Sequence, residues 1–167
     1  MDDDVPDAEQ APKARAKWPH DWNTYEEYRT VHASYMEGLI KEGIVYEERL
    51  TFREITYRSR IVQVQIHGHI QCARDVIIIV DKLLDAERDW DGRLIVKGSE
   101  YSYHAYIRST SHSVIRYDCH GEHGLSSLHK HTFNPKTGKE LDSEPIELDD
   151  LPSLAEVIRD AVERAPE

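Results

Sequence analysis

Polar and apolar residues alternate most clearly over residues 60–72, whose sequence is RIVQVQIHGHIQC. Successive side chains of an extended strand point to opposite faces. The valines and isoleucines at the even positions therefore share one face, and the glutamines share the other with His67 and His69. This pattern predicts a strand that is buried on one side only.

Other segments carry weaker strand patterns. Residues 75–84, DVIIIVDKLL, form an apolar run that predicts a strand buried on both faces. Residues 93–107 predict a further strand, interrupted at 97–99, and residues 113–118 another after a short hairpin loop. Residues 45–55 fit a strand slightly better than a continued helix, and residues 134–138, NPKTG, predict a turn.

Two segments have the three- and four-residue spacing of amphipathic helices. The first begins near Asn23 or Thr24, either of which can cap it, and ends at Gly43. Its predicted apolar face consists of Tyr25, Tyr28, Val31, Tyr35, Leu39 and Ile40. The second covers residues 151–165, where Ser153 and Glu156 form a capping box.

The order of elements is a helix, a meander of strands and a second helix. It predicts an α+β fold in which an N-terminal and a C-terminal helix pack on an antiparallel β-sheet. Residues 1–22 have little apolar content and predict a flexible arm, and residues 23–167 predict a single domain.

Composition and charge limit the cellular locations and the partners that we expect for this protein. No apolar run approaches the roughly 20 residues of a membrane span, and the N-terminus, MDDDVPDAEQ, is unlike a secretory signal, so we expect a cytoplasmic protein without a membrane partner. The net charge of −11 argues against nucleic-acid binding over the whole surface. The same net charge is compatible with a local basic site, with a basic partner or with a high-salt host.

Candidate chemistry is concentrated in residues 115–133, IRYDCHGEHGLSSLHKHTF. Four histidines and an aspartate fall in this short stretch, and a glycine-containing loop separates the two histidine pairs. The candidate site residues are Arg116, Asp118, His120, His123, His129 and His131.

Two kinds of chemistry use such a cluster. Imidazoles with a carboxylate can hold a divalent transition metal such as zinc, and the ligands would be His120, His123, His129 and either Asp118 or His131. Alternatively, one histidine removes a proton while another donates one, as metal-independent RNA cleavage requires.

A cation beside the histidines would stabilise charge during RNA cleavage. Arg116 suits this better than Lys130, because Lys130 would point away from His129 and His131 on a strand. His67, His69 and His104 are further histidines that can reach the cluster or simply belong to the sheet. A third possibility is a non-catalytic module that binds a partner through the helix at 24–42, with Tyr25, Tyr28 and Tyr35 as anchors.

The string RYD at 116–118, the histidines that follow it and HKH at 129–131 resemble the TumE family of toxin–antitoxin proteins. The aromatic segment YSYHAY at 101–106 and the closing helix fit the same family. The resemblance covers about 61–167 and implies a toxin paired with an antitoxin protein. Cys119 stands where many members have asparagine, and residues 1–44 lie outside the resemblance, which suggests an added partner or homodimer surface.

Overall fold

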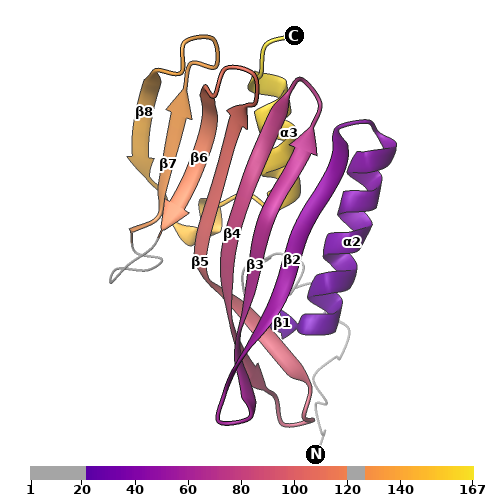
Figure 1. Ribbon diagram of the computed structural model, residues 1–167. Coiled ribbons are helices and arrows are strands. Elements are labelled where there is room, and N and C mark those ends of the chain that lie inside the picture. The colour runs from indigo at the N-terminus through magenta and orange to yellow at the C-terminus, as the bar shows by residue number, and fades with distance from the viewer. Residues whose placement is uncertain (1–21, 120–126) are drawn as a thin grey trace, which may run out of the picture.

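A computed structural model describes residues 22–119 and 127–167 of the chain (Figure 1). The predicted arm at 1–22 lies outside the described residues except for Trp22. Within the described ranges, no helix has the length and apolar character that crossing a membrane would need.

Seven long or medium strands form one antiparallel meander in the order β2-β3-β4-β5-β6-β7-β8, and the short β1 pairs with β5. The strands are β1 (Asn23–Thr24), β2 (Val45–Tyr57), β3 (Arg60–Cys72), β4 (Val76–Arg88), β5 (Leu94–Ile107), β6 (Ser113–Cys119), β7 (His129–Phe133) and β8 (Glu140–Pro145).

Within residues 22–119 and 127–167, helices α2 and α3 and the short 3-10 helix η2 accompany the sheet. Helix α2 (Tyr25–Lys41) begins at Thr24, whose side chain accepts a hydrogen bond from the Glu27 amide. Helix α3 (Leu154–Arg164) follows the 3-10 helix η2 (Leu148–Asp150) and has the predicted capping box of Ser153 and Glu156. The α+β fold with an N-terminal and a C-terminal helix is confirmed.

Both α-helices contact the sheet on one face. Helix α3 contacts β4 and β6, and α2 contacts β2 and β5; Figure 1 looks onto the sheet with α3 behind it. The core between the sheet and the helices includes Met36, Leu39, Val64, Ile66, Ile70, Ile78, Val80, Ala105, Val157 and Ile158. We call the opposite side of the strands the open face.

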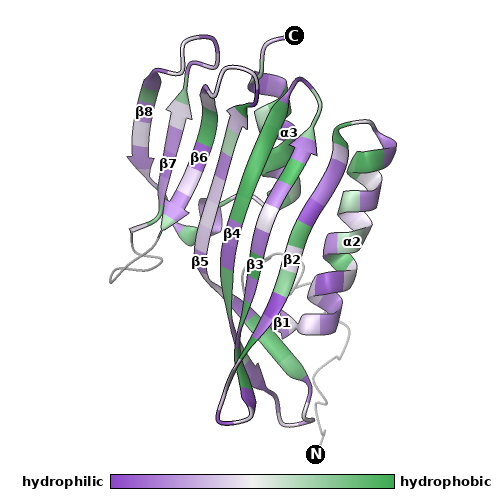
Figure 2. Ribbon diagram, in the orientation of Figure 1, coloured by the Kyte–Doolittle hydropathy of each residue, from purple (hydrophilic) through white to green (hydrophobic). Residues whose placement is uncertain are grey.

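The structure corrects two expectations and adds one strand that was not predicted. Val31 and Ile40 are 56% and 48% exposed, because α2 turns His32 and Met36 toward the sheet instead. Strand β4 is buried on both faces only at its start, where Ile77 is 8% exposed, whereas Ile79 farther along the open face is 41% exposed although the apolar run continues in Figure 2. Strand β8, whose residues are all exposed, carries no apolar alternation and was not predicted.

Gly68 brings β2 and β3 unusually close together. It has a φ of +146°, and a Cβ at this position would lie 1.9 Å from the carbonyl oxygen of Arg49 on β2. Because the obstacle is backbone, a side chain cannot be accommodated by a rotamer change. Gly68 thus fixes the alignment of the strand that carries His67 and His69.

We expect Gly68→Ala to lower the free energy of unfolding by at least about 2 kcal/mol, because the strands must separate and the backbone is strained. Denaturant unfolding followed by circular dichroism measures this loss. The matched control is Gly38→Ala in α2, where a Cβ meets nothing within 4 Å and should leave stability unchanged or raised by roughly 0.5–1 kcal/mol. Equal stability of both variants would contradict the role of Gly68.

Lys82 of β4 is a lysine buried in the core between the sheet and α2. Its Nζ donates to the Tyr28 hydroxyl at 2.6 Å and lies 4.9 Å from the ring centroids of both Tyr28 and Tyr101. These aromatic faces offset only part of the cost of burying an ammonium ion. Burial therefore lowers the pKa of Lys82 from 10.5 to about 7.

This lysine makes stability depend on pH. Between about pH 7 and pH 10 the unfolded chain keeps the proton of Lys82 while the folded chain releases it, so stability rises with pH in that window. We expect Lys82→Met to flatten this slope and to be more stable than the wild type near pH 7. Urea unfolding at several pH values tests this, with the exposed Lys41→Met as control; a slope that persists in Lys82→Met would refute it.

Candidate functional site

The open face gathers histidines from three strands. Residues directly opposite one another in antiparallel pairs lie on the same face. One such row crosses the sheet through His69, Ile79, His104, Arg116 and His131. The adjacent row crosses it through His67, Asp81, Ser102, Asp118 and His129.

Four of the six predicted site residues lie together on this face. Arg116 and Asp118 are on β6, and His131 and His129 are their respective partners on β7. His120 and His123 lie outside the described residues. Lys130, between the two β7 histidines, points to the helix-covered face, where its Nζ lies 5.9 Å from the Tyr117 ring centroid. The expectation that Lys130 turns away from the histidines is thus correct.

The ring of His129 is held by the backbone. Its Nδ1 lies 2.5 Å from the carbonyl oxygen of Ser127, and because a carbonyl can only accept, Nδ1 carries the proton and donates it. In the neutral ring Nε2 then bears a lone pair. A histidine whose tautomer leaves the lone pair on Nε2 is equipped to accept a proton at that atom.

The ring of His131 lies between two carboxylates. Its Nδ1 is 2.6 Å from Oε1 of Glu140 on β8, and its Nε2 is 3.8 Å from Oδ1 of Asp118. The first contact is a hydrogen bond that fixes the ring, whereas the second is too long to be one. Asp118 therefore attracts a proton on Nε2 electrostatically but does not accept a hydrogen bond from it.

Arg116 and Asp118 form an ion pair beside these rings. Arg116 Nε lies 2.8 Å from Asp118 Oδ2, in an orientation that does not make a hydrogen bond. The arginine side chain is 38% exposed, and its two terminal amino groups hold its remaining donors. The ring centroids of His129 and His131 are 6.3 Å apart, so a group of phosphate size can contact both rings.

Two further residues, His104 and Glu140, lie next to members of this cluster. His104 is half-buried next to Arg116, and its Nε2 lies 2.8 Å from the Ser113 hydroxyl. Burial first, and then the charge of Arg116, lower the pKa of His104, so its ring is neutral at neutral pH. Glu140 could not be identified from the sequence, because it lies on β8 beyond the turn and lacks a motif of its own.

A predicted metal site is not assembled by the described part of the chain. Within residues 22–119 and 127–167, no group of three or more histidine, cysteine or acidic side chains is arranged to hold a metal ion. Two of the proposed zinc ligands, His120 and His123, are outside these ranges. The metal site stays a prediction.

The helix predicted as a docking element is packed inward instead. Tyr25, Tyr28 and Tyr35 of α2 pack against the core, and Tyr28 also accepts the hydrogen bond of Lys82. This arrangement favours a structural role for the three tyrosines over a role as interface anchors.

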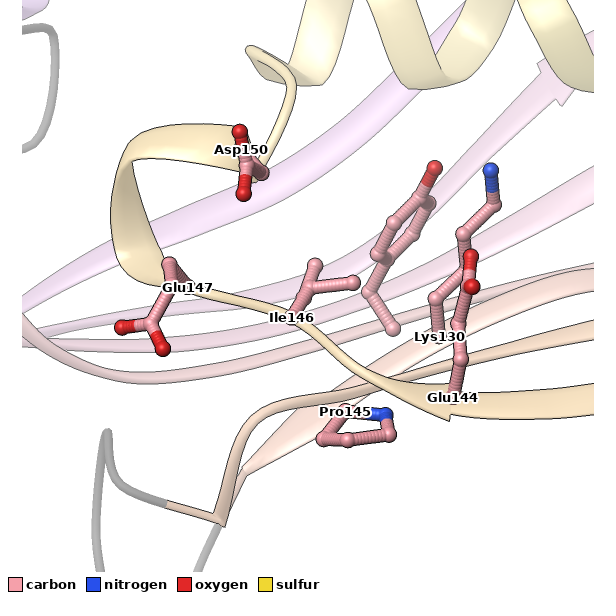
Figure 3. Close-up of a pocket in the computed structure, with 7 residues that line it drawn as sticks. Lys130, Glu144, Pro145, Ile146, Glu147 and Asp150 are labelled. Carbon is pink, nitrogen blue, oxygen red and sulfur yellow. The ribbon is translucent and has the colours of Figure 1, made fainter.

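A separate hollow of about 440 Å³ lies on the helix-covered side of β7 (Figure 3). Figure 3 shows Glu147 and Asp150 along its wall and Lys130 beside Glu144. The three carboxylates make this hollow unsuited to a phosphate ligand, and it lies on the other side of the sheet from the imidazoles of β7.

Comparison of the chain with models of protein families, with curated proteins and with solved structures finds no match. The resemblance to the TumE family therefore stays a prediction that depends on the motif residues alone.

The hydrogen bonds predict the tautomers of both β7 histidines. We expect His129 and His131 to carry the proton on Nδ1 when neutral, which is the less common tautomer in solution, because each Nδ1 faces an acceptor. Nitrogen-15 chemical shifts at alkaline pH report this directly. In Glu140→Ala, His131 should revert to the Nε2 tautomer while His129 keeps its own; an unchanged His131 would contradict the arrangement.

Proposed function

We propose that this protein is a ribonuclease that cleaves RNA by histidine acid–base chemistry on the open face, and that it acts as the toxin of a toxin–antitoxin pair. The observation that supports the reaction best is the pair of imidazoles on β7, one whose Nδ1 hydrogen bond leaves the lone pair on Nε2 and one flanked by carboxylates.

His129 is the general base in this proposal. Its Nε2 takes the proton of a ribose 2′-hydroxyl, and the 2′-oxygen attacks the adjacent phosphorus. The bond from phosphorus to the 5′-oxygen of the next nucleotide then breaks. The products are a 2′,3′-cyclic phosphate and a free 5′-hydroxyl.

His131 is the general acid. In its protonated form it donates to Glu140 through Nδ1 and retains the Nε2 proton for the leaving 5′-oxygen. Arg116, the cross-strand partner of His131, places positive charge where the phosphorus centre gains negative charge. Asp118 orients Arg116 and attracts the Nε2 proton of His131, which makes it a positioning residue.

The toxin assignment depends on the resemblance of RYD at 116–118 and HKH at 129–131 to the TumE family. Three of these residues, Arg116, Asp118 and His131, contact one another or lie within 4 Å. The motif thus coincides with a local polar network, and an antitoxin protein is the partner that the resemblance implies.

Cleavage of a fluorescent RNA in the presence of a chelator tests the reaction. We expect His129→Ala and His131→Ala each to lower kcat by roughly 10²–10⁴-fold, as loss of a general base or acid does. Products of the wild type should end in a 2′,3′-cyclic phosphate.

Lys130→Ala is the matched control, because Lys130 lies between the two histidines but on the other face of β7. Its kcat should stay within a few fold of the wild type. Absence of cleavage by the wild type, equal cleavage by both histidine variants, or activity only after addition of zinc would refute the proposal. Growth arrest on expression of the wild type, relieved in His131→Ala, tests the toxin role separately.

A further inference from the structure

The open face is also hollowed at a distance from the histidine pair. A hollow of about 510 Å³ is formed there by β3, β4 and the end of β5. It is lined by His67, Gly68, His69, Gln71, Ile77, Ile79, Tyr106 and Arg108.

The floor of this hollow is apolar. Ile77 is buried, and Ile79 is 41% exposed although its neighbours on the open face are mostly polar. Tyr106 is half-buried at the side and meets the ring of His104 at 5.8 Å between centroids. A flat apolar floor with an aromatic side wall matches the face of a nucleobase, which stacks without regard to sequence.

The rim of the hollow is polar and in part cationic. His67, His69 and Gln71 present ring nitrogens and an amide that can bond to the edge of a base. Arg108 lies at the rim, and Arg116 lies farther along the row of His104. These arginines stand out in a chain of net charge −11 and suit the phosphates on either side of a bound base.

The cross-strand row connects the hollow to the histidine pair. Ile79 of the hollow and His131 lie in the same row, three strand spacings apart, which corresponds to about 14 Å. A ligand that occupies both sites must therefore extend over more than one nucleotide. Its bases must also be unpaired, because pairing would hide them from the apolar floor.

We propose that this hollow is a base-binding subsite that makes single-stranded RNA the substrate of the open face. The inference rests on the proposed ribonuclease function. It specifies in addition that the substrate is single-stranded and longer than one nucleotide. The strand lies across β4 to β7, with one base over Ile79 and the cleaved phosphate at His129 and His131.

Binding is tested apart from cleavage. Fluorescence anisotropy with the full-length His129→Ala/His131→Ala protein and a labelled ten-nucleotide RNA measures Kd. We expect Ile79→Ser and Tyr106→Ala in this background to raise Kd roughly 5- to 100-fold, as loss of one stacked base does. A fully paired duplex should bind more weakly than the single strand.

Matched controls come from exposed residues elsewhere. Val31→Ser, at an exposed apolar position of α2, and Trp90→Ala, at an aromatic residue 91% exposed, should leave Kd unchanged. His69→Gln supplies an independent rim variant if either hollow variant unfolds, and it should also weaken binding. In the active protein, Ile79→Ser should raise KM for the decamer by a larger factor than it lowers kcat.

The outcomes separate the two proposals. Cleavage by the wild type with unchanged Kd in all three hollow variants, or tighter binding of duplex than of single strand, would overturn the subsite alone. Single-strand binding that depends on the hollow, without cleavage, would overturn the ribonuclease alone. Absence of both binding and cleavage would overturn both.

Discussion

Both helices cover the same face of the sheet, and the position of nearly every polar group follows from this one-sided burial. Alternate residues of each strand are then committed to the core or to the open face. On β6, for example, Tyr117 is buried while Arg116 and Asp118 remain accessible. Polar chemistry is confined to one side because the other side is occupied by apolar packing.

The covered side nevertheless contains ionisable groups. His32 of α2 bonds to Glu48 of β2 at 2.7 Å, and Lys82 bonds to Tyr28. These contacts attach α2 to the sheet with fixed geometry, because buried polar groups are costly unless paired. Within the described residues Lys82, unlike His131, has aromatic partners and no carboxylate, so the core accommodates this amine most easily in its neutral form.

The sequence predicts most of the framework, since alternation over 60–72 and the capping box at Ser153 depend on local rules. Where neighbours decide burial, sequence reasoning fails. The apolar run of β4 suggested cover on both faces, yet Ile79 on the open face is 41% exposed. On α2 the buried positions include His32, because a carboxylate on β2 satisfies it.

The candidate site can also be predicted from the sequence only in part. A same-face pair of His129 and His131 follows from their spacing on a strand, and the pairing with Arg116 and Asp118 follows from a hairpin-like return of the chain. Glu140 does not follow, because it reaches His131 from a strand with no apolar pattern, where the β7–β8 pairing has an irregularity. Contacts of this kind are set by tertiary register, which no local motif encodes.

Glu140 belongs to β8, the last strand of the sheet, which pairs only with β7 and whose side chains are all exposed. Strands at a sheet edge separate from their neighbour at a much smaller free energy than global unfolding. Each such opening removes the acceptor of His131 Nδ1 and lets the ring rotate. The fraction of molecules with a correctly oriented His131 is therefore tied to fraying of β8, and hydrogen exchange of its amides measures that fraction.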